Sequence, residues 1–171
     1  YMVSAFGGTS PRRLVFGFMC ASAFLSMWIS NTSTTLMLLP VALAALEKTD
    51  DMNLSGPLLL GIAYAASIGG IGTPIGTPPN MVFMGVYTEV TGGAVSFGQW
   101  MLWAIPVVLI LLPIAGLWIT RGVSKSGGVV LPEAEAWSTA ERRVLVIFSI
   151  TALLWMTRKG PWGGWSEWLS P

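Results

Sequence analysis

The segment Ser26–Thr35 reads Ser-Met-Trp-Ile-Ser-Asn-Thr-Ser-Thr-Thr, and it places short polar side chains inside a long apolar stretch. Residues 14–46 contain no Asp, Glu, Lys or Arg. A single helix over this stretch would exceed the roughly 20 residues that cross a bilayer, and it would leave Asn31 poorly solvated at its centre. Two helices of about 16 residues, joined at residues 30–33, fit better, although each is short for a full crossing at about 1.5 Å per residue. The stretch therefore predicts a re-entrant hairpin over residues 14–46 rather than two full spans, and either arrangement puts both ends on one side of the membrane.

A second interruption follows at Gly69–Asn80, which reads Gly-Gly-Ile-Gly-Thr-Pro-Ile-Gly-Thr-Pro-Pro-Asn within another uncharged stretch. The sequences on either side, Ser55–Ile68 and Met81–Tyr87, are typical of helices. Proline removes a backbone donor and glycine lowers helix propensity, so the helix is expected to unwind between them. A bare loop cannot face lipid, so this backbone must be buried in protein or line a cavity. We therefore predict a discontinuous helix over residues 55–91.

The composition places the chain among membrane proteins. Of its 171 residues, 53% are hydrophobic and 10% are charged, whereas a soluble domain carries about 25% charged residues. The net charge of +1 gives no indication of nucleic-acid binding, and the lone Cys20 excludes an internal disulfide. The chain begins at Tyr1, which suggests a piece of a longer protein. The predicted fold class is an all-α polytopic membrane protein with a re-entrant helical hairpin and a discontinuous transmembrane helix.

The rest of the chain predicts two further helices. Residues 93–121 contain an ordinary span with Trp100 and Trp103 as interfacial anchors. Residues 122–143 read as a cytoplasmic linker that ends in a Ser-Thr-Ala-Glu capping box, and residues 144–171 begin with another apolar helix. The positive-inside rule supports this topology, with seven basic residues inside and two outside: Arg12, Arg13, Lys48, Arg121, Lys125, Arg142 and Arg143 against Arg158 and Lys159.

We expect the two breaks to meet and to bind an anion together with a cation. A helix break exposes a half-helix N-terminus, whose partial positive charge and free N–H groups attract carboxylates. Unwound carbonyls and half-helix C-termini attract cations, and hard oxygen ligands suit Na⁺. The neutral oxygens available are those of Ser26, Ser30, Asn31, Thr32 and Thr77, together with the carbonyl of Gly76. With no Asp, Glu or His in any span to relay protons, and no buried Arg or Lys to neutralise the anion, a bound cation would supply the charge, which favours sodium-coupled anion transport.

Other interpretations of the two breaks remain open. The polar run after Ser30 could only cap the second arm of the hairpin, and Gly69–Asn80 could be a glycine-hinged kink. In that case the protein would be a non-transporting membrane interaction subunit. A carboxylate exchanger of the same fold is a further alternative. The sequence contains no metalloprotease, kinase or hydrolase motif, so an enzymatic activity is not predicted.

The triplet Ser30-Asn31-Thr32 and the Gly-Thr-Pro-Pro-Asn of residues 76–80 resemble the divalent-anion/sodium symporter family of dicarboxylate transporters. The resemblance implies sodium ligands at Ser26, Ser30, Asn31 and the Gly76 carbonyl. It implies contacts of a succinate-like di- or tricarboxylate, or another divalent anion, with Asn31, Thr32, Thr77 and Pro78.

The same resemblance implies an inverted-repeat transporter that moves its substrate by an elevator-like shift, works as a homodimer and lies in the cell (inner) membrane as a multi-pass protein. Residues 1–92 would then be a portion of the transport core, and residues 144–171 the truncated first helix of a second repeat. The chain has one Ser-Asn-Thr triplet where that family has two, so half of the site is expected outside it. Thr77 stands where a serine is common in the family.

Overall fold

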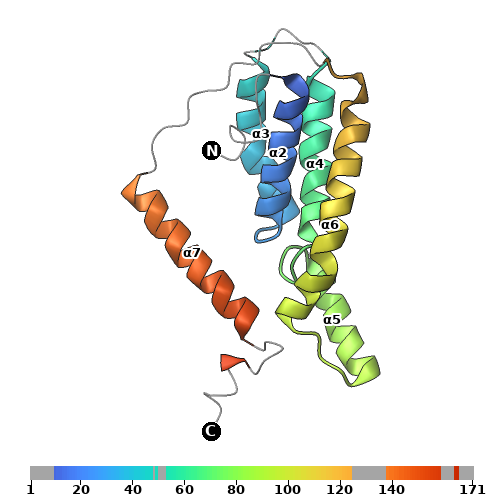
Figure 1. Ribbon diagram of the computed structural model, residues 1–171, viewed down its shortest axis with the longest axis vertical. Coiled ribbons are helices and arrows are strands. Elements are labelled where there is room, and N and C mark those ends of the chain that lie inside the picture. Colours follow the sequence, from blue (N-terminus) through green and yellow to red (C-terminus); the bar gives the residue numbers. More distant parts are fainter. Residues whose placement is uncertain (1–9, 48, 50–52, 125–137, 159–163, 166–171) are drawn as a thin grey trace.

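The computed structural model describes residues 10–47, 49, 53–124, 138–158, 164 and 165 (Figure 1). Within these residues every regular element is helical and there is no strand, which confirms the all-α prediction. The elements are α2 (Pro11–Ser26), α3 (Asn31–Leu46), α4 (Ser55–Gly70), α5 (Pro78–Thr91), α6 (Phe97–Ile119), the 3₁₀ turn η1 (Thr120–Gly122) and α7 (Thr139–Thr157). Most of the predicted linker and the end of the chain lie outside the described residues.

The helices α2, α3, α4 and α6 lie side by side, whereas α5 continues beyond the end of α4 and α7 stands to one side (Figure 1). The closest pair is α2 with α4, where small residues let the two backbones approach. A Cβ atom at Gly69 would overlap the backbone of Ala23, and one at Gly61 would lie 3.1 Å from side-chain atoms of Met19. The Ser22 hydroxyl also donates to the Ile62 carbonyl at 2.8 Å. This closely packed pair of helices holds the two predicted interruptions in place.

The predicted pair of helices of about 16 residues is present, since α2 and α3 each have 16 residues. The chain turns at residues 27–30, however, three residues earlier than the predicted junction. The reason is that the Ser30 hydroxyl accepts the Ser33 N–H at 3.2 Å and acts as the N-cap of α3. The polar residues after Ser30 therefore form the first turn of a helix rather than a loop. The depth of this hairpin in a membrane stays a prediction.

The predicted interruption of the second stretch is also present, but it is shorter than expected. Helix α4 continues through Gly70 and α5 begins at Pro78, so the non-helical part is residues 71–77. Gly69 and Gly70 remain helical, packed against the hairpin. Proline is favoured in the first turn of a helix, where its missing N–H is not needed, so Pro78 starts α5 instead of ending the break.

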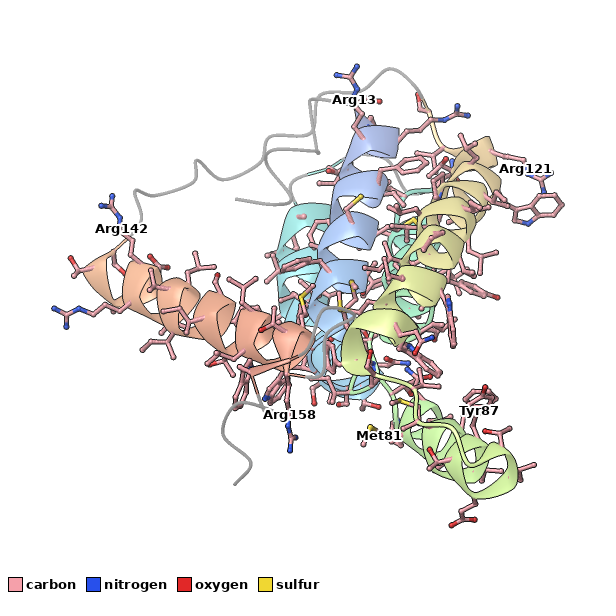
Figure 2. All side chains as sticks on the ribbon, turned by 60° about the horizontal axis from the view of Figure 1, so that its bottom comes forward. Arg13, Met81, Tyr87, Arg121, Arg142 and Arg158 are labelled. Atoms are coloured by element: carbon pink, nitrogen blue, oxygen red, sulfur yellow. The ribbon has the colours of Figure 1, made fainter. Side chains whose placement is uncertain are left out.

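The two ends of the bundle differ in charge. The Arg12 side chain donates to the carbonyls of Val123 at 2.9 Å and Arg121 at 3.0 Å, which ties the start of α2 to the end of α6. A cation at a helix C-terminus is favourable. Arg13 and Arg121 lie at this end, whereas Arg158 lies toward the breaks (Figure 2). For Arg12, Arg13, Arg121 and Arg158 this agrees with the predicted grouping, whereas Arg142 lies at the far end of α7, apart from the bundle (Figure 2). Lys48, Lys125 and Lys159 lie outside the described residues, and the topology stays a prediction.

Of the described helices, the stretch from Phe97 to Gly122 is the one long and apolar enough to cross a bilayer. Helix α7 begins with the predicted capping box: Glu141 N–H donates to the Ser138 hydroxyl at 3.2 Å, and Ser138 N–H donates to the Glu141 carboxylate at 2.7 Å. These hydrogen bonds hold the pKa of the exposed Glu141 below its usual value. The first turn of α7 is therefore polar, and its apolar part is correspondingly short.

Candidate functional site where the two breaks meet

The turn of the hairpin lies directly against the non-helical segment between α4 and α5, as predicted. The Thr73 hydroxyl donates to the Met27 carbonyl across a sequence separation of 46 residues. A Cβ atom at Gly72 would lie 2.7 Å from the Met27 side chain, and one at Gly76 would lie 2.9 Å from the Ser26 carbonyl oxygen. We call residues 27–30 the hairpin break and residues 71–77 the helix break.

Two of the predicted ligands on the hairpin are joined to each other. The fully buried Ser26 hydroxyl donates to the side-chain oxygen of Asn31 at 2.6 Å. That same oxygen lies against the end of α4, because a Cβ atom at Gly70 would overlap it. The Asn31 amide is thus held between its own helix turn and the last turn of α4.

Gly76 completes this cluster from the helix break. It is buried, and a Cβ atom there would lie 2.5 Å from the Gly70 carbonyl oxygen and 2.9 Å from that of Ser26. Only glycine fits this approach of backbone to backbone. The carbonyl oxygens of Gly70 and Ser26 therefore lie against the Gly76 backbone, and the Asn31 amide oxygen lies next to Gly70.

The chemistry of this cluster fits a small monovalent cation. Carbonyl, amide and hydroxyl oxygens are hard ligands, as Na⁺ prefers. Within the described residues no group of three or more His, Cys, Asp or Glu side chains could hold a metal ion, so the carboxylates typical of Ca²⁺ and Mg²⁺ sites do not gather here. The cluster brings together three predicted ligands, Ser26, Asn31 and Gly76.

The other predicted residues on the hairpin lie at its exposed face. The Ser30 hydroxyl bonds to Ser33, through the backbone N–H at 3.2 Å and the hydroxyl at 2.8 Å. Thr32 is exposed one residue into α3. The N–H groups of Asn31 and Thr32 make no hydrogen bond within the described part of the chain, so the N-terminus of α3 presents free donors. This is the arrangement that binds anions at helix N-termini.

The N-terminus of α5 offers different groups. Its N-cap, Thr77, is half-buried and makes no side-chain capping bond, so its hydroxyl is not used by the helix. Pro78 and Pro79, both exposed, have no N–H, and the Asn80 N–H bonds to the Thr77 carbonyl at 3.1 Å. The general expectation of free N–H donors at a helix break therefore holds at α3 but fails for the first turn of α5.

Three residues that hold the breaks in place were not predicted as site residues. The Asn80 side-chain amide donates to the carbonyls of Gly70 and Thr73, both at 2.8 Å. Thr73 connects the two breaks, and the Trp100 indole donates to the Ile71 carbonyl at 2.9 Å. Asn80 stood within the predicted motif, and its polarity inside an apolar segment was the one available signal.

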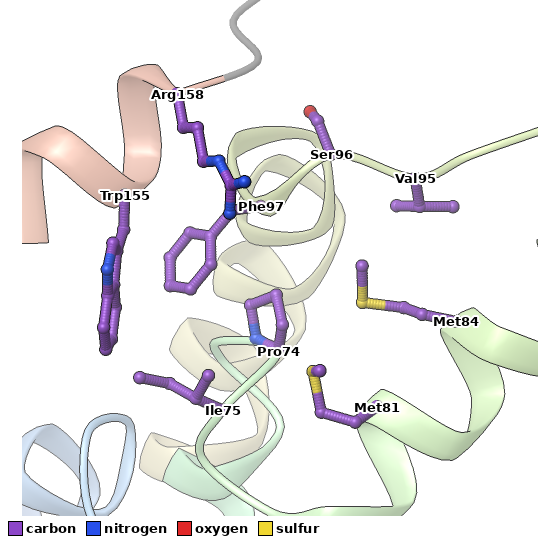
Figure 3. A pocket seen from close by; sticks show the side chains of 9 residues that line it. All are labelled: Pro74, Ile75, Met81, Met84, Val95, Ser96, Phe97, Trp155 and Arg158. Carbon is purple, nitrogen blue, oxygen red and sulfur yellow. The ribbon is translucent and has the colours of Figure 1, made fainter. Parts of the chain in front are cut away.

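A separate cavity of about 310 Å³ lies on another side of the helix break, between α5, α6 and α7 (Figure 3). Its lining is mostly apolar, with Arg158 and Ser96 as the polar side chains. Trp155 of α7 and Arg158, which follows this helix, face Phe97 and Pro74 across it (Figure 3). None of the predicted ligands lines this cavity, so it is distinct from the oxygen cluster.

Comparison with known proteins supplies independent evidence. The family model for citrate transporters (CitMHS) matches residues 1–164. The sodium-dependent dicarboxylate transporters SdcS of Staphylococcus saprophyticus and of Staphylococcus aureus are each 33% identical to the chain over 174 aligned positions. Both alignments cover 89% of this chain and 34% of the relative, so the chain spans about a third of the length of the proteins that it matches.

Proposed function

The chain belongs to the citrate transporter family, and we propose that it forms part of the transport core of a sodium-coupled symporter for di- or tricarboxylates or other divalent anions. The family assignment makes it an integral membrane protein with a transport role, and confirms the resemblance to the dicarboxylate transporters of the divalent-anion/sodium symporter type. The names of the relatives support both sodium and a dicarboxylate as ligands.

The observation that carries the proposal is the oxygen cluster of Ser26, Asn31 and Gly76. The Ser26 hydroxyl bonds to the Asn31 amide oxygen, and the Gly76 backbone of the other break packs against the Ser26 carbonyl. Na⁺ bound there would receive the Ser26 hydroxyl, the Asn31 amide oxygen and the Gly76 carbonyl, with Ser30 as a further ligand from the end of the hairpin. The cation would join the two breaks, so sodium would stabilise the arrangement that recognises the substrate.

The anion is assigned to the adjacent N-terminus of α3. The free N–H groups of Asn31 and Thr32 and the Thr32 hydroxyl would donate to a carboxylate, and the Thr77 hydroxyl with the Pro78 ring would contact it from the second break. Asn31 is both a proposed sodium ligand and a proposed contact of the anion. A residue that touches cation and anion together gives a direct physical link between their affinities.

Charge explains why the two ligands would bind together. Residues 14–46 and 54–88 contain no ionised side chain. A dianion at this site would meet only dipoles and hydroxyls, whereas Na⁺ in the oxygen cluster would supply a full positive charge nearby. Because coupling between two sites is reciprocal, the dicarboxylate must raise the affinity for sodium by the same factor.

The lengths of α2 and α3 support a re-entrant position for the hairpin. Sixteen residues rise about 24 Å, less than the roughly 30 Å of a bilayer core. We include in the proposal a multi-pass protein of the inner membrane that works as a homodimer with an elevator-like movement. A second repeat, beginning with α7, would supply the other half of the site.

The test is succinate uptake into proteoliposomes that contain the full-length protein, with external Na⁺ or with K⁺ in its place. We expect uptake only with Na⁺, and we expect Asn31→Ala to abolish it, because an amide that bridges cation and carboxylate has no apolar substitute. Cys20→Ser, a small change elsewhere in α2, is the control and should retain uptake.

Uptake that needs internal dicarboxylate but not Na⁺ would indicate an exchanger instead. Failure of folded protein to take up succinate, citrate or sulfate would refute transport, and equal losses in both variants would mean that folding is being measured.

A further inference from the structure

The Thr73 hydroxyl makes one hydrogen bond to each of the two breaks. The residue is fully buried, and its hydroxyl donates to the Met27 carbonyl while it accepts the Gly76 N–H at 3.1 Å. The Gly76 N–H also lies 3.3 Å from the Thr73 carbonyl. A single side chain therefore connects the hairpin break to the residue whose carbonyl is proposed to bind sodium.

Asn80 fixes the same segment from its other end. Its side chain is 7% exposed, and its amide nitrogen donates to the Gly70 and Thr73 carbonyls, both at 2.8 Å. These two bonds span the helix break and join the first turn of α5 to the last residue of α4. Both protons of the Asn80 amide nitrogen donate to backbone carbonyls, so this nitrogen serves to hold the backbone in place.

These bonds matter because the helix break has no helical hydrogen-bond ladder of its own. Residues 71–77 are non-helical, and the position of Gly76 is set by Thr73, by Asn80 and by its close approach to the Gly70 and Ser26 carbonyls. Binding sites need ligand positions held within about 0.5 Å by neighbouring groups. Loss of the hydrogen bonds of either side chain would let Gly76 move away from the Ser26 carbonyl.

We propose that Thr73 and Asn80 are positioning residues for the sodium site, which hold the Gly76 backbone against the oxygens of the hairpin. This inference rests on the proposed sodium-coupled function. Both residues act through Gly76, so their loss should weaken sodium binding. Within the described residues, the hydrogen bonds of the Thr73 and Asn80 side chains go to Met27, Gly76, Gly70 and Thr73, and so to neither of the proposed anion contacts, the N-terminus of α3 and the Thr77 hydroxyl. Once sodium is saturating, the affinity for the dicarboxylate should therefore return almost to that of the wild type.

The experiment measures succinate uptake by the full-length protein in proteoliposomes, as a function of external Na⁺ and, at saturating Na⁺, as a function of succinate. Thr73→Val removes the hydroxyl at nearly constant shape, and Thr73→Ser restores it. Thr88→Val is the matched control, because the Thr88 hydroxyl bonds to the Met84 carbonyl at 2.9 Å on the exposed side of α5. Asn80→Leu removes the amide that holds the other end of the same segment.

We expect Thr73→Val and Asn80→Leu to raise the Na⁺ concentration for half-maximal uptake about tenfold, as loss of a buried hydrogen bond predicts. The succinate KM at saturating Na⁺ should stay within about twofold of the wild type, and Thr73→Ser and Thr88→Val should behave like the wild type. Sodium-dependent wild-type uptake with an unchanged Na⁺ requirement in Thr73→Val would overturn the inference alone. A lower maximal rate with an unchanged Na⁺ requirement would also overturn it, since that indicates less folded protein.

Wild-type uptake that is independent of Na⁺ would overturn the proposed function and this inference together. If Thr73→Val yields no folded protein, Asn80→Leu decides by the same criteria. A second readout is the rise in melting temperature on exchange of KCl for NaCl, measured on the purified full-length protein. The rise should need about tenfold more NaCl in the two variants than in Thr73→Ser, and equal requirements would contradict the positioning role.

Discussion

The hairpin break and the helix break lie against each other, but they are built in opposite ways. The hairpin break is four residues long and ends in a capped helix, where the Ser30 hydroxyl satisfies the Ser33 N–H. The helix break is seven residues long, and Thr77, which starts the following helix, makes no capping bond. The first break is stabilised locally, whereas the second depends on Thr73 and Asn80, which reach backbone carbonyls outside their own turn.

The two breaks also differ in the groups that they offer to a ligand. After the hairpin break, the N–H groups of Asn31 and Thr32 make no hydrogen bond to any residue that the structure describes. After the helix break, two prolines remove the donors at the same positions, and what remains is the Gly76 carbonyl and the Thr77 hydroxyl. In the proposed site, the first break would donate N–H groups to the anion, and the second would add the Gly76 carbonyl for the cation and the Thr77 hydroxyl for the anion. This division of roles would make both breaks necessary for coupled binding.

The contact between the breaks depends most strongly on Gly69, and its substitution should have the largest effect. In Gly69→Ala the new methyl group would overlap the Ala23 backbone, which cannot move unless α2 and α4 separate. We expect a loss of about 3 kcal/mol or more, seen as loss of folded full-length protein after detergent extraction.

Gly85→Ala is the matched control for this substitution. Gly85 lies in α5, and a methyl group added there would meet nothing within 4 Å, so alanine should be tolerated or stabilise the helix by about 0.5–1 kcal/mol. Similar melting temperatures for the two variants would contradict the close packing of α2 on α4, and with it the support on which both breaks rest.

The sequence predicts the number and kind of helices because long uncharged stretches leave few alternatives. It does not locate the hairpin turn, since Ser30, Asn31, Thr32 and Ser33 are all acceptable N-caps. In the structure Asn31 is engaged by Ser26 and by the end of α4, and Ser30 is the residue that caps the helix by accepting the Ser33 N–H.

The site could be predicted only in part for a similar reason. The sequence indicates which oxygens are available, but the bond of Thr73 to Met27 joins residues 46 positions apart, and no local pattern encodes it. Glycine in a sequence predicts a helix break, whereas Gly69 and Gly70 are helical and serve close packing. A small residue in an apolar segment can either break a helix or allow close packing, and only the neighbouring helix distinguishes these two roles.

Ser30 tests whether the hairpin break is only a capped turn. Ser30→Ala should lower stability by about 1 kcal/mol through loss of the N-cap, measured by thermal unfolding of the full-length protein in detergent. Asparagine is an equally good N-cap, so Ser30→Asn should restore the melting temperature. If Ser30 also binds sodium, Ser30→Asn should still need more Na⁺ for half-maximal uptake. Full recovery of both properties in Ser30→Asn would remove Ser30 from the proposed ligands and leave it with capping alone.

Thr77 occupies the corresponding position at the helix break, and its effect on stability should be the smallest. Because the Thr77 side chain makes no capping bond, Thr77→Ala should change the free energy of unfolding by only a few tenths of a kcal/mol, roughly the scale of an exposed substitution. Its proposed contact with the carboxylate predicts instead a succinate KM about tenfold higher, since a hydrogen bond to a charged group is worth about 1.5–3 kcal/mol. Thr77→Ser keeps the hydroxyl and should hold the KM within about twofold of the wild type. A large fall in melting temperature with an unchanged KM would reverse the comparison, because the helix break would then depend on its N-cap and the hairpin break alone would recognise the anion.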